Sequence, residues 1–302
     1  MEKETIQEVI IIGGSYAGLS AAMALGRAGR KVMVVDSGKP CNAQTPHSHN
    51  FLTQDGEIPA AIAAKGLAEV LKYPTVTHLN DFVTAAVKIN DHFELKTATG
   101  QSLKAKKLLF ATGLKDVMPE IKGFAECWGI SVIHCPYCHG YEVAGQKTAL
   151  LANGEIAFHF SQVLSQWTKD LVLYTNGPAE LNEEQRFQLQ NHGIPVIEIP
   201  VKELLQANGQ LKSLLLQDGQ EHFFKAMYGK VGLEQHSSLP QKLGCEINEQ
   251  GYLVIDDKKQ TTISGLYAAG DCTTMARSVS IAVASGTLSG VSINAALISE
   301  SW

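Results

Sequence analysis

Basic residues are scarce in this sequence, and long apolar runs are absent. Its 302 residues include 25 Lys and Arg against 30 Asp and Glu, which gives a net charge of −5. A chain with this charge has no cationic field to hold a polyanion, so we expect neither nucleic acid nor an anionic membrane surface as a partner. No stretch approaches the ~18 uninterrupted apolar residues of a membrane helix.

The composition also lacks the bias of a disordered chain. Hydrophobic residues make up 45% and charged residues 18% of the sequence, which is typical of a globular protein long enough for two domains. The first eight residues are polar and acidic, unlike a secretory signal peptide. The sequence therefore predicts a cytoplasmic protein.

A second cysteine pair is missing. Cys135 and Cys138 are three positions apart, whereas the other four cysteines stand alone: Cys41, Cys127, Cys245 and Cys272. A zinc site would need a second pair at ligand spacing, so no metal site is predicted. The letters C-x-x-C-H also spell the haem c attachment motif, which would need an exported protein. A redox pair and two inert thiols are the remaining interpretations.

The local sequence favours redox chemistry for this pair. Pro136 lies between the cysteines and favours a helical first turn that presents both sulfurs on one side. Backbone N–H groups at a helix N-terminus and a neighbouring imidazolium stabilise a thiolate. Thiols in a reducing compartment are expected to stay free unless their task is redox. Dithiol–disulfide exchange is therefore the predicted chemistry of Cys135 and Cys138.

A glycine-rich turn follows the first apolar strand. Residues 9–12 have the pattern of a buried strand and residues 19–25 that of a helix, with the turn at residues 13–18. Gly13 permits the tight turn, and Gly18 lets the helix approach the strand. The N–H groups at the helix N-terminus would then meet a pyrophosphate.

An acidic residue completes this unit. A strand at residues 31–35 ends in Asp36, which lies 18 residues after Gly18. This is close to the spacing of ~20 residues expected for a carboxylate that binds a ribose. The middle glycine of G-x-G-x-x-G is Ser15 here, whose side chain must make room for the phosphates or hydrogen-bond to them. The unit as a whole predicts a bound dinucleotide.

The rest of the chain alternates between helices and strands, with loop-rich segments at residues 37–59 and 232–246. Helices are expected at residues 58–70, 181–192 and 278–298, and one more helix is expected to end at residue 167. Strands are expected at residues 76–79, 82–87, 93–97, 102–103, 107–110, 148–151, 171–175, 194–199, 211–217, 222–227, 252–255 and 263–269.

A second strand–turn–helix unit begins at residue 148. Ala152 replaces its first turn glycine, and residues 174–180 contain no Arg or Lys to hold a 2′-phosphate. The sequence therefore predicts a nucleotide-binding fold that lacks the charges for NADPH, which leaves NAD(P)H uncertain as a cofactor.

Several motifs together resemble the thioredoxin reductase family of low-molecular-mass flavoproteins, and the resemblance covers nearly the whole chain. They are the turn with Gly13, Gly14, Ser15, Ala17 and Gly18, then Asp36, the strand end Ala111-Thr112-Gly113, the pair Cys135 and Cys138, and Gly270-Asp271. The resemblance implies an α/β fold of two Rossmann-like, three-layer domains, the second inserted in the first. Residues 1–117 and 232–302 would bind FAD, and residues 118–231 would form an NAD(P)-binding-like domain with the redox pair.

The resemblance also implies where FAD would lie. Gly13, Ser15 and Gly18 would lie at the pyrophosphate, Asp36 at the adenosine ribose and Asp271 toward the ribityl chain. The other expected contacts are Gly14, Ala17, Gln44, Ala111, Thr112, Gly113 and Gly270. Cys138 would face the isoalloxazine, and Cys135 would exchange with the substrate. In the first loop, His47 and His49 are either flavin neighbours or, as we favour, solvated loop histidines.

Some positions depart from thioredoxin reductases. An Asp follows the second Cys in that family, whereas His139 holds this place here. The family's Arg-Gln pair is not recognisable at Arg277-Ser278. The string Cys-Pro-Tyr-Cys-His-Gly-Tyr-Glu looks more like the branch with dithiol oxidases of disulfide natural products. An imidazole with an ordinary pKa of about 6.5 can take and give a proton, so His139 would either act as a proton shuttle or only cap or pack.

The predicted function is an FAD-dependent thiol–disulfide oxidoreductase. Electrons would pass between flavin, the pair Cys135 and Cys138, and a thioredoxin-like protein or a small-molecule dithiol or disulfide. A nicotinamide donor would make it a reductase, whereas molecular oxygen as the acceptor would make it a dithiol oxidase. A flavin-binding redox sensor without turnover is the alternative from another class. By resemblance, we expect a homodimer.

Overall fold

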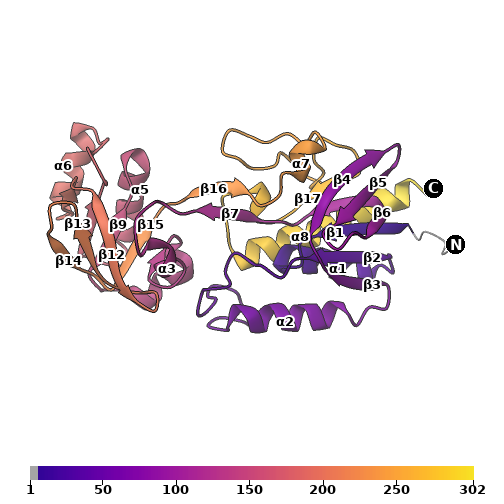
Figure 1. The fold of residues 1–302 in the computed structure, drawn as a ribbon, viewed down its shortest axis with the longest axis horizontal. Helices are drawn as coiled ribbons and strands as arrows, with labels where there is room; N and C mark the ends of the chain where they lie inside the picture. The colour runs from indigo at the N-terminus through magenta and orange to yellow at the C-terminus, as the bar shows by residue number, and fades with distance from the viewer. Residues whose placement is uncertain (1–5) are drawn as a thin grey trace. The chain divides into compact units, whose positions relative to one another are not determined.

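The computed structural model describes residues 6–302, so most of the polar N-terminal segment lies outside the described residues. The chain divides into two compact units, which Figure 1 shows as ribbons. Unit 1 comprises the residues up to Ala43, Phe51–Lys115 and Leu233–Trp302. Unit 2 comprises Gln44–Asn50 and Asp116–Gly232. Each unit is built on a mainly parallel sheet with helices, which confirms the predicted α/β class.

Unit 1 contains a seven-stranded sheet in the order β3-β2-β1-β6-β5-β4, and β17 pairs with the end of β6. β1 is parallel to β2 and β6, whereas β5 is antiparallel to β4 and β6. The strands are β1 (Gln7–Ile12), β2 (Val32–Asp36), β3 (Val76–Asn80), β4 (Val83–Ile89), β5 (His92–Thr97), β6 (Ser102–Phe110) and β17 (Leu266–Ala268).

Both faces of β1 are buried, as its run of isoleucines predicts. Val9 and Ile11 pack in a core with the helices on one face of the sheet, and Ile10 and Ile12 pack in a second core on the other face. The helices of the first core are α1 (Tyr16–Arg27), α2 (Pro59–Val70) and α8 (Val279–Ser299), and α7 (Leu239–Lys242) contributes to the second. The sheet therefore lies between two layers.

α8 packs very closely on α1. A Cβ added at Gly286 would lie 2.0 Å from the carbonyl oxygen of Ala17, and one at Gly290 would lie 2.8 Å from that of Ala21. By length and composition, α8 is the one described helix that could cross a membrane. One face of α8 is buried against α1, and 33% of its apolar segment is buried in all.

Unit 2 contains a five-stranded parallel sheet in the order β11-β10-β9-β15-β8 and a three-stranded antiparallel sheet in the order β12-β13-β14. Its strands are β8 (Val132–Ile133), β9 (Thr148–Leu151), β10 (Leu171–Tyr174), β11 (Val196–Ile197), β12 (Val201–Ala207), β13 (Gln210–Leu216), β14 (Glu221–Phe223) and β15 (Ala226–Gly229). Its helices are α3 (Phe124–Cys127), α4 (Pro136–His139), the 3₁₀ helix η1 (Tyr141–Val143), α5 (Gly154–Leu164) and α6 (Glu183–Asn191).

Apolar side chains of α5 and α6 bury the central strands of this sheet. Ala157 and Leu164 of α5 share a core with Leu150 of β9 and Leu173 of β10. Leu189 of α6 joins the same core. Two short strands, β7 (Leu114–Val117) and β16 (Gly232–Gln235), pair with each other where the chain passes between the units.

One long strand replaces two predicted ones. β6 runs without a break where the sequence predicts strands at residues 102–103 and 107–110. Residues 102–105 pair with β5, and residues 108–110 pair with β17. This change of partner along one strand explains why its sequence has the pattern of two.

Other predicted elements are also wrong in detail. Residues 222–227 do not form one strand, because β14 and β15 belong to different sheets. Residues 252–255 form isolated bridges rather than a strand. α5 ends at Leu164 instead of residue 167, and β12 was not predicted at all. The segment expected as a loop at residues 232–246 contains β16 and α7.

Candidate functional site

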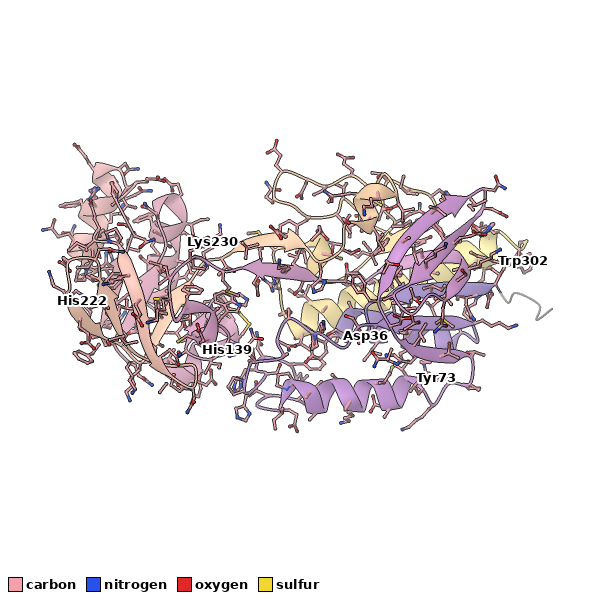
Figure 2. All side chains as sticks on the ribbon, in the orientation of Figure 1. Asp36, Tyr73, His139, His222, Lys230 and Trp302 are labelled. Carbon is pink, nitrogen blue, oxygen red and sulfur yellow. A yellow bond between two sulfur atoms is a disulfide. The ribbon has the colours of Figure 1, made fainter. Side chains whose placement is uncertain are left out.

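Cys135 and Cys138 form a disulfide at the start of α4, with their Cα atoms 5.3 Å apart. Its yellow sulfur–sulfur bond lies near the label of His139 in Figure 2. Cys135 is the N-cap of α4, and its Sγ accepts a hydrogen bond from the backbone N–H of Cys138 at 3.1 Å. Pro136 occupies the first helical turn, as predicted. When the disulfide opens, the N–H group would stabilise a thiolate on Cys135.

Tight packing fixes the C-terminal end of α4. A Cβ added at Gly140 would lie 2.4 Å from the carbonyl oxygen of Pro136 and 2.8 Å from Nε1 of Trp167. The ring of Tyr137 meets the Trp167 ring edge to face, with centroids 5.3 Å apart. Only glycine fits at position 140 without a shift of these neighbours, so the redox helix has a rigid support.

An aromatic stack leads to the residue before Cys135. The rings of Phe124 and Trp128 stack with centroids 5.8 Å apart, and Trp128 stacks on His134 at 5.6 Å. Nε1 of Trp128 donates a hydrogen bond to Oδ2 of Asp116 at 3.0 Å. The stack therefore holds the backbone on the N-terminal side of the disulfide.

His139 lies in a cluster with two further titratable residues. The ring of His49 meets the His139 ring edge to face, with centroids 6.2 Å apart. Nε2 of His49 lies 3.4 Å from Oε1 of Glu142. Burial lowers the pKa of His139, and His49 lowers it further, whereas Glu142 raises it. At neutral pH His139 is therefore mainly an uncharged base.

The buried free cysteines have the opposite environment from a reactive thiol. Burial raises the pKa of Cys127 and Cys245, and it raises the pKa of Cys272 to about 12. A thiol with a raised pKa carries little thiolate at neutral pH. The half-buried pair in α4 is thus chemically distinct from these cysteines.

In unit 1, the predicted glycine turn is packed against the end of β6. A Cβ added at Gly13 would lie 2.3 Å from the carbonyl oxygen of Ala111, and one at Gly18 would lie 1.9 Å from the carbonyl oxygen of Gly13. Gly13 also has a φ of 106°, which glycine adopts easily. Ser15 is the N-cap of α1, and its side chain makes no capping hydrogen bond.

Asp36 lies directly beside this turn. The backbone N–H of Gly14 donates to Oδ1 of Asp36 at 2.9 Å, and that of Gly38 donates to Oδ2 at 3.2 Å. Figure 2 labels this carboxylate in unit 1. The predicted ribose-binding carboxylate and the predicted phosphate-binding turn are therefore joined directly by hydrogen bonds.

The remaining predicted residues of unit 1 gather around the same turn. Gly270, with a φ of 80°, approaches Ala17 of α1, because an added Cβ would lie 2.9 Å from the Cβ of Ala17. Nε of Arg277 donates to Oδ2 of Asp271 at 3.3 Å. Thr112, between Ala111 and Gly113, has a buried Oγ1 with no hydrogen-bond partner among the described residues. Such an orphaned hydroxyl fits a polar ligand at this position.

The predicted contact of Gln44 with the cofactor stays a prediction. Gln44–Asn50 belongs to unit 2, and Gln44 lies against Gly129, where an added Cβ would lie 3.2 Å from its Cγ. The same loop, Gln44–Asn50, places the ring of His49 against that of His139. The interpretation of His49 as a solvated loop histidine is therefore wrong, since its side chain is 21% exposed in a cluster.

In the second nucleotide-binding-like unit, Asn153 links the N-terminus of α5 to the loop after β10. Oδ1 of Asn153, the N-cap of α5, accepts hydrogen bonds from the N–H groups of Gly154 and Glu180, both at 2.9 Å. Nδ2 of Asn153 donates to the carbonyl oxygen of Pro178 at 2.9 Å. No Lys or Arg lies between Leu171 and Asn182.

Sequence reasoning did not assign roles to His49, Glu142 or the stack that ends at His134. Glu142 and His134 lie within the same short stretch as the cysteines, so proximity could have marked them. No sequence signal connects His49 to that stretch. Among residues 6–302, no group of three or more His, Cys, Asp or Glu side chains has the geometry of a metal site.

Unit 1 has a dinucleotide-binding turn with its acidic residue, and unit 2 has a nucleotide-binding-like fold with a disulfide at α4. This combination defines a disulfide oxidoreductase with two Rossmann-like domains. The comparisons give the family. A model described as pyridine nucleotide-disulphide oxidoreductase matches residues 7–286. The chain belongs to this family.

Relatives agree with this assignment. Thioredoxin reductase tcpT of Claviceps purpurea is 32% identical over 311 residues, covering 99% of this chain and 97% of that protein. Thioredoxin reductase sirT of Leptosphaeria maculans is 30% identical over 307 residues, covering 96% and 94%. The solved structure of an oxidoreductase from Agrobacterium tumefaciens is 35% identical, with a TM-score of 0.92, and covers 97% of this chain and 99% of that chain. The protein is thus a thioredoxin reductase-like flavin disulfide oxidoreductase.

Proposed function

We propose that this protein uses FAD to pass electrons between the Cys135–Cys138 pair and an external dithiol or disulfide. The observation that carries the proposal is the half-buried disulfide at the start of α4, whose Cys135 sulfur accepts a backbone hydrogen bond. His139 stands next to Cys138 as an uncharged base. These groups are what thiol–disulfide exchange requires.

The residues of unit 1 fit FAD. The turn at Gly13 has no room for side chains, Ser15 has a hydroxyl without a capping bond, and Asp36 lies beside the turn. The buried Oγ1 of Thr112 lacks a partner among the described residues. We assign Ser15 to the pyrophosphate, Asp36 to the ribose and Thr112 to the flavin half. When bound, FAD supplies a two-electron carrier for the disulfide.

The exchange step follows from the geometry of α4. His139 takes the proton of the incoming external thiol, and the resulting thiolate attacks Sγ of Cys135. The sulfur–sulfur bond breaks, and Cys138 leaves as a thiolate that receives this proton from His139. The second external thiol then attacks the mixed disulfide and releases Cys135. The external dithiol loses two electrons and two protons, and the pair gains them. The reverse sequence reduces an external disulfide.

A second candidate function differs from the first in naming the direction of electron flow, from the external dithiol to the flavin. Asn153 and Glu180 occupy the helix N-terminus at which a nicotinamide dinucleotide would place its pyrophosphate, and no Lys or Arg lies between Leu171 and Asn182. Arg186 contacts this loop, but its guanidinium already binds the carbonyl oxygens of Ala179 and Leu181 and the carboxylate of Glu198. This favours a dithiol oxidase in which molecular oxygen is the final acceptor. Its net reaction would convert a dithiol and oxygen into a disulfide and hydrogen peroxide.

Anaerobic mixing separates these two candidates. Dithiothreitol, NADPH and NADH are each added to the purified yellow protein, and the flavin absorbance is followed. Rapid bleaching by the dithiol alone supports the oxidase. Bleaching by NADPH at a similar rate supports a reductase and contradicts the oxidase.

We propose that the protein forms a homodimer through one exposed face of α8. Apolar side chains recur on its exposed face with alternating spacings of three and four residues, at Ile281, Ala284, Leu288, Val291, Ala295 and Ile298. Leu288 is 52% and Val291 57% exposed. This is the spacing at which two helices pack together. A second copy of the same face would cover it.

We further propose a cytoplasmic location. Outside α4, Cys127, Cys245 and Cys272 are buried thiols that form no disulfide. Free thiols beside one redox disulfide suit a reducing compartment.

A further inference from the structure

The loop Gln44–Asn50 contributes a side chain to the redox centre. It belongs to unit 2 together with α4. Within the loop, His47 and His49 have ring centroids 6.4 Å apart, and His49 is the one whose ring meets His139. The loop therefore brings an imidazole from far along the chain to the residue beside Cys138.

His49 connects His139 to a carboxylate. Its ring lies perpendicular to the His139 ring, at an interplanar angle of 88°, and its Nε2 lies 3.4 Å from Oε1 of Glu142. The Glu142 side chain is 40% exposed, whereas that of His49 is 21% exposed. The three side chains thus form a row that starts at the residue after Cys138 and ends at a partly exposed carboxylate. We call this row the His139–His49–Glu142 cluster.

The two neighbours act on His139 with opposite charge. His49 becomes a cation when it is protonated, and a cation opposes a second proton on His139. The charge of the Glu142 carboxylate favours that proton. His49 reaches His139 from the loop, and Glu142 reaches it from η1. The protonation of His139 therefore depends on two groups with opposite effects, one on the loop and one on η1.

We propose that His49 and Glu142 are positioning residues, which hold the His139 ring beside the disulfide and set the pH range in which it exchanges protons with Cys138. This inference rests on the proposed function, because it assigns the cluster a task in thiol–disulfide exchange. The edge-to-face contact with His49 holds the His139 ring in place, and the contact with Glu142 holds the His49 ring. The exposed carboxylate gives the cluster an end in solvent at which protons enter and leave.

The test is the pH profile of anaerobic flavin bleaching by excess dithiothreitol, measured on the FAD-bound protein from about pH 5 to 9. The rate is expected to fall at low pH as His139 becomes protonated, and we call this fall the acid limb of the profile. His49→Asn removes the positive charge that His49 carries when protonated, so the acid limb moves to higher pH. Glu142→Gln removes the opposite charge, so the limb moves to lower pH. Each shift is expected to be about one pH unit or less.

Matched variants separate this role from general damage. His159→Asn and Glu184→Gln remove an exposed imidazole and an exposed carboxylate from the same unit, outside the cluster. Both should keep the wild-type profile. Glu142→Asp keeps the charge and should restore most of the profile that Glu142→Gln loses. If His49→Asn does not fold, the Glu142→Gln and Glu142→Asp pair carries the test by itself.

The outcomes are distinct. Opposite shifts in the two variants, with equal flavin content, support the inference. Profiles that coincide with those of wild type and the controls, or that shift in the same direction, overturn it while leaving the proposed function intact. Wild-type protein that binds FAD but is not bleached by dithiol at any pH overturns the proposed function itself.

Discussion

Oδ1 of Asn153 accepts a hydrogen bond from the backbone N–H of Glu180 at 2.9 Å, which draws the loop after β10 onto the N-terminus of α5. A Cβ added at Gly154 would lie 3.6 Å from Oε2 of Glu180, so this carboxylate lies close to the helix N-terminus. Helix N-termini attract anions, and here the chain supplies its own.

This arrangement predicts weak NADPH binding. Two missing charge-assisted hydrogen bonds, at about 1.5–3 kcal/mol each, weaken binding about 10²- to 10⁴-fold relative to a site that has both cations. Titration calorimetry on the FAD-bound protein should therefore show no saturation at micromolar NADPH. A micromolar Kd would contradict the reading of this turn as a lost site.

His139→Asn should slow thiol–disulfide exchange by about 10²- to 10⁴-fold, the usual contribution of a general acid or base. Because the pKa of His139 is lowered by burial, the uncharged base is available at neutral pH and is lost as the pH falls through this lowered pKa. The wild-type rate should thus fall on the acid side of pH ~6.5. The variant should lack this limb, and a variant with the full wild-type profile would show that His139 only packs.

Gly140→Ala should destabilise unit 2. The added Cβ meets backbone at Pro136 and the indole of Trp167, and overpacking of this kind costs about 1–3 kcal/mol. Gly66→Ala is the matched control, since Gly66 lies in α2 and its added Cβ meets only Leu19 at an ordinary 3.4 Å. The control should leave the melting temperature unchanged or raise it. Equal melting curves for wild type and Gly140→Ala would disprove the tight support of α4.

Leu288→Glu should convert the proposed dimer into monomers. A carboxylate in the middle of the exposed apolar row of α8 would be buried without a partner on association. Light scattering after gel filtration gives the mass directly. Thr287→Glu, on the adjacent exposed position of the same helix, is the control, and a dimer that survives Leu288→Glu would place the interface elsewhere.

Local sequence patterns were sufficient for much of unit 1. The glycine turn, Asp36 and Gly270-Asp271 were all predicted, and in the structure they lie together, because a parallel sheet brings the ends of β1, β2, β6 and β17 to one edge. Their signal is local, since each motif follows its own strand.

Contacts between distant segments could not be predicted in the same way. β6 changes partner along its length, and residues 222–227 leave one sheet and enter another, so that local apolar patterns misplace both. The place of Gln44 and His49 in unit 2 depends on packing against Gly129 and His139, which no periodicity encodes.

The central claim is that electrons enter or leave the flavin through the Cys135–Cys138 pair, and anaerobic absorbance spectroscopy of Cys138→Ser tests it most directly. The variant should remain yellow with a full complement of FAD, because Cys138 lies outside the glycine turn and Asp36. Excess dithiothreitol should bleach wild-type protein and leave the flavin of Cys138→Ser oxidised. Bleaching of the variant at the wild-type rate would contradict the account.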